Sequence, residues 1–576
     1  MNSKNPSNGV HGPVAALAMA RDCRRDSAPS TAVLLCRDLQ KLGNGLDLRG
    51  LCYWLEHGHE ELRARITVGL CRTPGEVRHA GDAGVQRIVL GLCALDHSEV
   101  ELQFEARKAG LDPLGIEAVD LGAFCSLVEG SGSGTRKAKL LLAAAVAKVR
   151  AYPGSTPENV KPCLAPLTQK VGRRALFTLP PIQYQVVASI DGRRCVADSG
   201  CSLCVQACPR DAMAGAGGRI EISRSACDGC GSCLAACPKD AIRLPGSSPA
   251  EIEAQIGALL AADFIQDTGQ DTGQDTGDRP ERRILFTCRK GIQAIEWVGP
   301  GGVGASPHWL PVVVPCAGMV PAGCILSCVA SGVQVGLTAC GDACSPGQRA
   351  AAAERVGYCQ ELLRSFGLSP GLVSLVSPED EPEQFEASAI PRGFESASAE
   401  AAAPHGGMFG PAALGLALRT LKERYGSPAT LSLDHPGSPA GVVEVDPELC
   451  TACGACAEAC PTGALEFQSD DEGVELVFDG SRCAACELCL PACPENTAGA
   501  IYVKRTTDFA RLTEGPVTLY RDRQARCEAC GAPIAALSML SRIASLLGEE
   551  DTPLVRQLGR YCVSCKGSTA GWGGRA

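Results

Sequence analysis

The feature that most constrains the fold of this chain is a cysteine spacing that occurs twice between residues 450 and 494. The two runs read CTACGACAEACP (450–461) and CAACELCLPACP (483–494), and each has the spacing C-x2-C-x2-C-x3-C-P. This spacing lets three thiolates surround one [4Fe–4S] cluster in a tight loop, while the fourth cysteine binds a second cluster. Zinc binding by CxxC pairs would not explain this double pattern. The predicted ligand sets are Cys450, Cys453, Cys456 and Cys493 (quartet C) and Cys460, Cys483, Cys486 and Cys489 (quartet D).

A second pair of runs lies earlier in the chain. It reads CVADSGCSLCVQACP (195–209) and CDGCGSCLAACP (227–238), and only its second run has the regular spacing. We expect the longer loop after Cys195 to bulge outward and to change the solvent exposure of its cluster. Without Cys195 as a ligand, that cluster would be a three-iron species. The predicted sets are Cys195, Cys201, Cys204 and Cys237 (quartet A) and Cys208, Cys227, Cys230 and Cys233 (quartet B). Both pairs of runs resemble bacterial two-cluster ferredoxins, in which a β-hairpin and a helix are repeated with pseudo-two-fold symmetry.

The amino-acid composition indicates in which compartment, and in which chemical role, so many cysteines occur. The chain has 34 cysteines in 576 residues, whereas disulfide scaffolds of this cysteine density are short secreted proteins. The apolar stretch 14–20 is too short for a signal peptide with a clear cleavage region, and no run is long enough to span a membrane. We therefore expect metal-bound thiolates in a reducing, cytoplasmic compartment. The net charge of −10 argues against nucleic acid as a partner.

The pattern along the chain predicts a multidomain fold of α/β and α+β parts. Two small α/β segments alternate with two ferredoxin-like modules, and a zinc-ribbon-like tail closes the chain. Expected strands of the first α/β segment are 32–36, 65–71, 87–93 and 111–120, with helices at 101–110 and 135–152. The expected divisions are a disordered N-terminus (1–30), the N-terminal segment (31–152), a connector (153–185), the first module (186–246), a flexible linker (247–280), the central segment (281–376), a linker with one helix at 412–424 (377–440), the second module (441–505) and the tail (506–576).

Four cysteines of the N-terminal segment lie at the ends of expected strands or in the loops after them. They are Cys36, Cys71, Cys93 and Cys125, with Cys23 and Cys52 as spares. Strand ends of a parallel sheet converge on one edge, where ligands of open α/β folds bind. Buried free cysteines without a ligand are the alternative.

The amino-acid sequence of this segment also resembles that of a known protein family. GLCRTPGEV (69–77), the run 83–113 and FCSLVEG (124–130) resemble the N-terminal domain of the heterodisulfide reductase A subunit. The resemblance implies a widely spaced [4Fe–4S] cluster on Cys36, Cys71, Cys93 and Cys125. That family continues with a flavin domain, but residues 153–190 hold no G-x-G-x-x-G after a strand, and GGVGAS (301–306) lacks the flanking strand and helix. We therefore expect no flavin.

The central segment resembles a different small redox protein. ILFTCRKG (284–291), VVVPCAGMV (312–320) and LTACGDACSPGQ (337–348) are similar to the delta subunit of methyl-viologen-reducing hydrogenase. That resemblance implies a [2Fe–2S] cluster, with Cys288, Cys316, Cys340 and Cys344 as candidate ligands. The family's second cysteine of the first motif is replaced by Gly291. Cys324 and Cys328 would substitute as ligands or pack in the core.

The tail contains two CxxC pairs, CEAC (527–530) and CVSC (562–565). Two such knuckles are typical of a tetrahedral zinc site, with Cys527, Cys530, Cys562 and Cys565 as ligands. A single iron ion, as in rubredoxins, would use the same geometry.

Together these features predict an iron–sulfur electron-transfer subunit without a substrate site of its own. The two resemblances imply redox partners, namely a hydrogenase or dehydrogenase as donor and a heterodisulfide-reductase-like acceptor. The alternatives are a self-contained oxidoreductase acting on a small molecule, and a redox sensor.

Overall fold

The structure is a computed structural model of the chain. It describes residues 31–43, 45–58, 62–71, 76–77, 85–93, 98–128, 132–164, 182–261, 282–294, 306–340, 346–377, 407–470, 473–547 and 559–568. The expected disordered N-terminus and the repeat QDTGQDTGQDTG lie outside these residues. No helix of the described residues combines the length and the hydropathy needed to cross a membrane.

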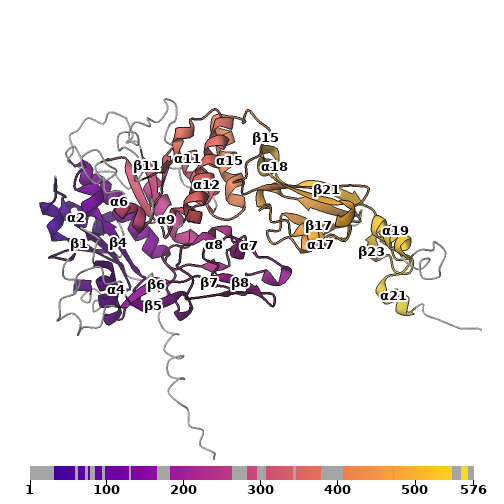
Figure 1. Cartoon of the computed structure of the whole chain (residues 1–576), viewed down its shortest axis with the longest axis horizontal. Helices are drawn as coiled ribbons and strands as arrows, with labels where there is room; N and C mark the ends of the chain where they lie inside the picture. Colours follow the sequence, from indigo (N-terminus) through magenta and orange to yellow (C-terminus); the bar gives the residue numbers. More distant parts are fainter. Residues whose placement is uncertain are drawn as a thin grey trace, which may run out of the picture.

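The N-terminal segment is a four-stranded parallel sheet in the order β2-β1-β3-β4 (Figure 1). Its strands are β1 (Thr31–Cys36), β2 (Leu62–Thr67), β3 (Arg87–Leu92) and β4 (Ile116–Asp120), and its helices are α2 (Leu48–Gly58), α4 (Ser98–Lys108), α5 (Leu121–Cys125) and α6 (Ser133–Ala151). Strands β1 and β3 are nearly continuous apolar runs, which suits the two interior strands of a parallel sheet. The strand expected at 65–71 ends at Thr67, so Cys71 lies in the turn beyond it. The strand expected at 111–120 begins only at Ile116.

The predicted connector is partly structured. Strands β5 (Val160–Leu164) and β6 (Ile182–Val186) pair antiparallel within it, after the 3-10 turn η3 (Pro157–Asn159). The Arg224 guanidinium of the first module donates to the carbonyl oxygens of Pro157 and Val160. These bonds attach the connector strands to the first module.

Each module contains a β-hairpin, a short two-stranded pairing of its ends and two short helices. In the first module β8 (Met213–Ala216) pairs with β9 (Arg219–Ile222), and β7 (Ser189–Ile190) pairs with β10 (Ile242–Arg243). Its helices are α7 (Leu203–Gln206) and α8 (Ser232–Ala236). In the second module β17 (Leu465–Ser469) pairs with β18 (Val474–Phe478), and β16 (Gly441–Val445) pairs with β19 (Ile501–Arg505). Its helices are α16 (Ala455–Glu458) and α17 (Cys489–Ala492).

The predicted flexible linker 247–280 begins instead with a buried helix, α9 (Pro249–Leu260). Ser248 and Glu251 form a capping box at its start, and Pro249 occupies the first turn, where a missing N–H costs nothing. Ile252, Ile256 and Leu259 are fully buried, and α9 packs against α6. The helix therefore belongs to the core between the two α/β segments.

The central segment repeats the strand order of the N-terminal segment, as a parallel sheet β12-β11-β13-β14. Its strands are β11 (Arg283–Thr287), β12 (Trp309–Val313), β13 (Gln334–Thr338) and β14 (Val373–Val376). Its main helices are α10 (Arg289–Ala294), α11 (Ala322–Ala330) and α12 (Pro346–Ser365), with the 3-10 turn η7 (Ala317–Met319) before α11. The helix expected at 412–424 is confirmed as α15 (Ala412–Tyr425), which packs against α11.

The tail continues the sheet of the second module. Strand β21 (Val517–Asp522) pairs with β18, and beyond it lie β22 (Gln524–Arg526), β23 (Pro533–Ala536), α19 (Leu537–Leu546) and α21 (Val563–Ser568). The shorter elements between the second module and β21 are β20 (Thr507–Asp508) and α18 (Phe509–Thr513), and β20 pairs with β15 (Ser432–Leu433), which precedes the module.

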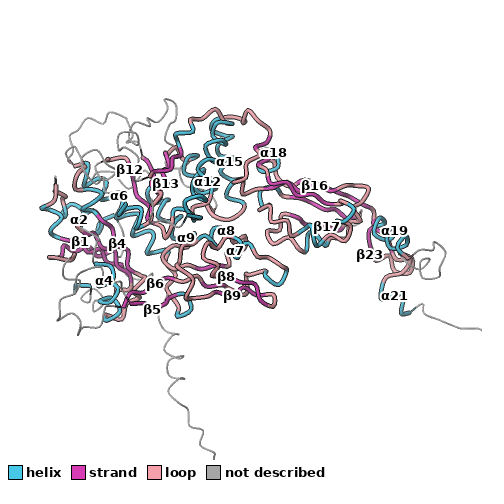
Figure 2. Tube along the Cα trace, in the orientation of Figure 1, coloured by secondary structure: helices cyan, strands magenta, loops and turns pink. Residues whose placement is uncertain are grey.

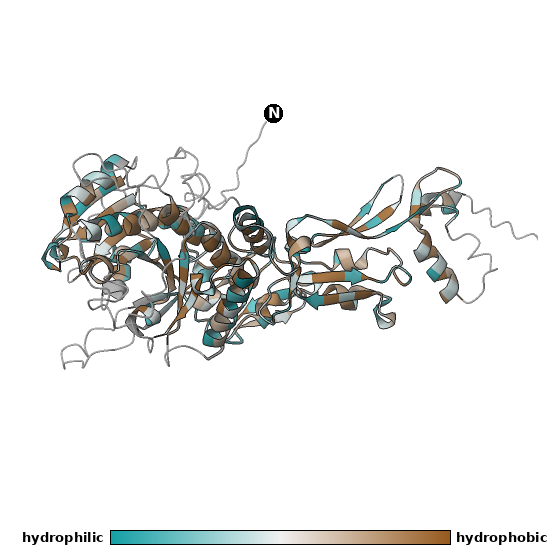
Figure 3. Cartoon of the chain, turned by 90° about the horizontal axis from the view of Figure 1, so that it is seen from above, coloured by the Kyte–Doolittle hydropathy of each residue, from teal (hydrophilic) through white to brown (hydrophobic). Residues whose placement is uncertain are grey.

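One hydrophobic core runs from the N-terminal segment through the first module and α9 to the central segment, and it includes Val89, Ile256, Val335 and Leu418. The second module has its own smaller core. Figure 2 shows that the second module and the tail extend from one end of this large body. Along the strands of that narrow part, hydrophobic and hydrophilic residues alternate (Figure 3), as in β18, where Val474, Leu476 and Phe478 point inward.

Candidate metal centres

The cysteines of the second module gather around two separate cavities. Quartet C, from Cys450 to Cys493, lines one cavity with apolar neighbours such as Phe467 and Ile501. Quartet D, from Cys460 to Cys489, lines the other. Each cavity is lined by three cysteines of one motif and by one cysteine of the other motif. The donor set of four thiols in an apolar pocket fits a [4Fe–4S] cluster.

In the first module, the cysteines of the irregular motif are arranged like those of the second module. All four cysteines of quartet A, Cys195 included, line one cavity. The longer spacing is taken up by the 3-10 turn η5 (Ala197–Ser199) and by Gly200 at φ 91°, and residues 198–200 are exposed. The loop therefore bulges outward as expected, while Cys195 stays with its quartet. In quartet B, burial raises the pKa of the Cys233 thiol, and charges on Cys230, Cys227, Cys204 and Cys208 raise it further, so these sulfurs are neighbours.

Burial also governs the protonation of the other quartets. It raises the pKa of Cys456 and of Cys489 to about 12, and neighbouring cysteine charges add to the effect. The pKa of Cys204 rises to about 11 for the same reasons. Such thiols are protonated near neutral pH unless a positively charged metal compensates the thiolate charge. The quartets are thus suited to hold thiolates only together with a metal.

Within each module the two quartets lie close together. Helix α7, which carries Cys204 of quartet A, packs against α8, which carries Cys233 of quartet B. Helix α16 with Cys456 likewise packs against α17 with Cys489. Between the modules, burial raises the pKa of Cys201, and the charges of Cys237 and then of Cys486 of quartet D raise it further. Figure 1 shows the two modules side by side.

In the N-terminal segment three of the four predicted cysteines come together at the carboxyl ends of the strands. The Sγ atom of Cys36 is 3.7 Å from those of Cys71 and Cys93, which are 2.8 Å from each other. The buried Cys125, at the end of α5, is not part of this group, and burial raises its pKa to about 12. Four thiolates around one zinc ion lie about 3.8 Å apart. Two of the three separations are close to this value, so the structure brings three of the predicted thiols, without Cys125, within reach of a single ion.

In the central segment only a pair of the predicted ligands meets. The Sγ atoms of Cys288 and Cys340 are 2.9 Å apart. A hydrogen bond from Cys340 and amide N–H donors of residues 290 and 291 lower the pKa of Cys288 to about 6, although burial opposes this. Cys316 instead donates to Gln348 Oε1, at 3.5 Å. Cys344 lies outside the described residues.

The spare cysteines of the central segment are core residues. Cys324 and Cys328 are fully buried on α11. The family's second cysteine has no room at residue 291, because a Cβ added to Gly291 would lie 2.5 Å from Thr338 Oγ1. The Gly291 N–H donates to Cys288 Sγ at 3.2 Å instead.

A cavity of about 540 Å³ lies between the first module and both α/β segments. Cys230 of quartet B and Cys288, Cys316 and Cys340 of the central segment all line it. Sequence analysis missed this cavity, since residues from four parts of the chain form it. Arg289 and Lys290 are the central segment's cationic residues on its wall, and burial among protein atoms lowers the pKa of Arg289 to about 10.

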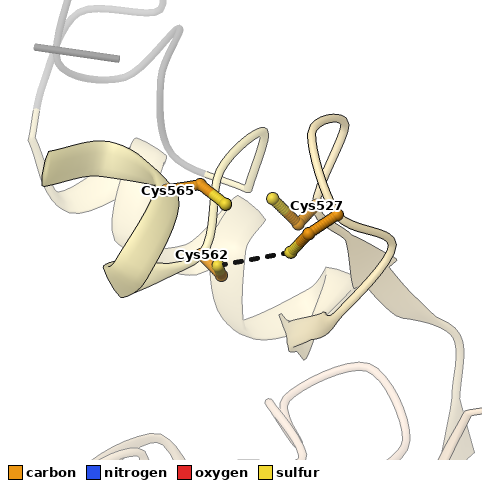
Figure 4. Close-up of side chains that lie close together, drawn as sticks. Cys527, Cys562 and Cys565 are labelled. Atoms are coloured by element: carbon orange, nitrogen blue, oxygen red, sulfur yellow. Dashed lines mark hydrogen bonds between the residues drawn. The ribbon is translucent and has the colours of Figure 1, made fainter. Parts of the chain in front are cut away.

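The tail brings both of its CxxC pairs together. The four Sγ atoms lie within 4.8 Å of one another, and those of Cys530 and Cys562 are 3.7 Å apart. Figure 4 shows the thiols of Cys527, Cys562 and Cys565 pointing toward a common centre. Arg560 donates to both carboxylate oxygens of Glu528, at 2.8 and 3.0 Å, and so ties the two loops together. This geometry fits a tetrahedral ion of zinc or iron.

Comparison with known protein families supports the identification of both modules as ferredoxin-like. Residues 449–497 match the model of a 4Fe-4S dicluster domain, and residues 188–238 match a second model with the same description. The chain therefore contains two ferredoxin-type dicluster domains, which account for four [4Fe–4S] clusters. No curated protein sequence shows significant similarity to the chain.

Proposed function

We propose that this chain is a multi-cluster electron-transfer subunit that relays electrons between a hydrogenase or dehydrogenase and a heterodisulfide-reductase-like acceptor. The observation that carries the proposal is that one chain holds two dicluster domains, with α7 packed on α8 in the first and α16 on α17 in the second. The charge of Cys486 in quartet D also reaches Cys201 in quartet A. The choice of partners rests on the two family resemblances described above.

Quartets B and C each adjoin a further part of the chain. Cys230 of quartet B shares a cavity with the Cys288–Cys340 pair. Glu495, which lines the cavity of quartet C, accepts a 2.9 Å bond from Arg542 of the tail helix α19. These contacts support the central segment and the tail as the two parts of the chain against which redox partners would dock.

In this mechanism the chain's own residues bind the clusters and shield them from water. Each quartet would hold one [4Fe–4S] cluster, which supplies one-electron chemistry when bound. The thiolates and the apolar residues around them exclude water and set the local charge, and both influence the reduction potential. The tail cysteines would hold a structural zinc ion, and the chain would bind no flavin.

An anaerobic count of iron, sulfide and zinc tests the proposal. Four clusters require about 16 iron atoms, a fifth cluster on the four cysteines of the N-terminal segment adds about four, and a [2Fe–2S] centre in the central segment adds about two. The same count should give one zinc ion, bound by the four cysteines of the tail. Replacing Cys489 by Ala should remove about four iron atoms and destabilise quartet C beside it. An unchanged iron content in that variant contradicts the assignment.

The cavity of about 540 Å³ favours a second candidate, a self-contained oxidoreductase, because its volume is in the range of small-molecule sites. Turnover of a small oxidant by the purified chain, with no partner present, would support this candidate and contradict the relay.

A further inference from the structure

The loop that carries Cys230 docks on the start of helix α12 through one amide side chain. Gln348 Nε2 lies 3.5 Å from Cys230 Sγ and donates to Ser232 Oγ at 2.8 Å. Its Oε1 accepts from Cys316 Sγ at 3.5 Å. The residue is 6 % exposed and lies at the wall of the cavity of about 540 Å³, as do Cys230 and Cys316.

The backbone around this contact has no spare room. A Cβ on Gly231, which has φ +84°, would lie 2.7 Å from Met319 Sδ, and one on Gly318 would lie 2.4 Å from Gln348 Oε1. Arg355 donates to the carbonyl oxygens of Gly318 and Val320, at 2.6 and 2.8 Å, and so holds the turn η7 in place. The close approach fixes the position of the amide between the two sulfurs.

We propose that Gln348 is a positioning residue that tunes the cluster of quartet B and couples it to Cys316 of the central segment. The inference rests on the proposed function, because it requires a cluster in quartet B. Cys316 then serves as a hydrogen-bond donor that orients the amide.

The physical basis is the charge on the cluster sulfur. An N–H donor directed at a ligand sulfur stabilises the extra negative charge of the reduced cluster and so raises its potential. An amide has its donors on one end and its acceptor on the other. With Cys316 donating to Oε1, the Nε2 end must face Cys230 and Ser232. Of the four quartets, only quartet B has such a donor from the central segment among the contacts found in the described residues.

The test is an EPR-monitored redox titration of the full-length protein carrying Gln348→Leu. We expect the potential of one cluster to shift downward while the other three keep theirs. The matched control is Gln360→Leu on the same helix, whose Nε2 donates to the Val373 carbonyl at 2.9 Å and touches no cysteine. Iron loss on replacing Cys233 by Ala identifies which signal belongs to quartet B.

Three further variants separate tuning from simple packing. Gln348→Glu keeps the shape but replaces the donor by an anionic acceptor, so the same cluster should shift downward by more than in Gln348→Leu. Cys316→Ser keeps a donor to Oε1 and should leave the potential nearly unchanged, whereas Cys316→Ala should shift it downward. Four unshifted potentials in both Gln348 variants, with iron content intact, would overturn the inference. A wild-type chain without iron in the first module would contradict the proposed function itself.

Discussion

The N-terminal and central segments are built on the same plan but use their cysteines differently. Both are parallel sheets in which the first strand lies between the second and the third. In both, a cysteine ends or follows each of the first three strands. These residues are Cys36, Cys71 and Cys93 in one segment and Cys288, Cys316 and Cys340 in the other. A parallel sheet delivers such residues to one edge whatever their separation in the chain.

What differs is the cysteine that follows the second strand. Cys71 joins its two partners at 3.7 and 2.8 Å, whereas Cys316 donates to Gln348 and leaves Cys288 and Cys340 as a pair. Gln348 belongs to helix α12 of the central segment itself, and the same amide contacts Cys230 and Ser232 of the first module, which packs against the central segment at this point. The comparison teaches that sheet topology brings thiols to an edge, while the packing around the edge decides which of them meet.

Loss of Cys93 should have the largest effect. The Cys93→Ala variant removes the thiol that lies within 3.7 Å of both partners, and the metal of the N-terminal segment should be lost entirely. A metal count should fall by about four iron atoms if the segment holds a cluster, or by about one ion if the trio binds a single metal. Cys52→Ala on helix α2 is the control and should retain all metal. An unchanged count in Cys93→Ala would show that the trio binds nothing.

Alanine at the second-strand cysteines tests the difference directly. Cys71→Ala should lose the N-terminal metal, because Cys71 belongs to the trio. Cys316→Ala should keep any iron of the central segment, since Cys316 bonds to Gln348 rather than to the pair. The measurement is iron per chain for both variants under identical reconstitution. Equal iron loss in the two would mean that Cys316 is a ligand after all, as the family resemblance implies.

Substitutions three residues after the first cysteine of each sheet should have a smaller effect, on the free energy of unfolding. Leu39 is fully buried, so Leu39→Ala should cost about 2–5 kcal/mol through the cavity it leaves. At Gly291 the change to Ala forces a methyl group against Thr338 Oγ1 and should cost about 1–3 kcal/mol. Denaturant unfolding of the metal-loaded protein measures both. A stabilised Gly291→Ala variant would disprove the tight contact.

The smallest effect concerns pH in the metal-free protein. The Cys288 pKa of about 6 lies below the ordinary thiol value of 9.0, so its thiolate forms as the pH rises through about 6. Folding stability from this group is fully present above pH 9.0 and is lost as the pH falls toward 6. Alkylation by iodoacetamide, mapped by mass spectrometry, should label Cys288 at pH 7 well before Cys125, whose pKa is about 12. Equal rates at both cysteines would contradict this.

The sequence by itself determined the cysteine quartets and most of the regular elements. Cysteines two or three residues apart can bind the same cluster or ion without help from distant segments, so the spacings from Cys450 to Cys456 and from Cys527 to Cys530 predict which sulfurs share a site. Continuous apolar runs such as 87–92 identified buried strands for a similar reason, because the pattern reports burial directly.

Only the tertiary structure decided the contacts between distant segments. Helix α9 was read as linker because it adjoins a polar repeat, and its burial depends on α6 and β12. Cys230 and Gln348 lie 118 residues apart, and Cys201 and Cys486 belong to different domains. No local spacing encodes such pairs, since they follow from how whole sheets and helices pack against one another.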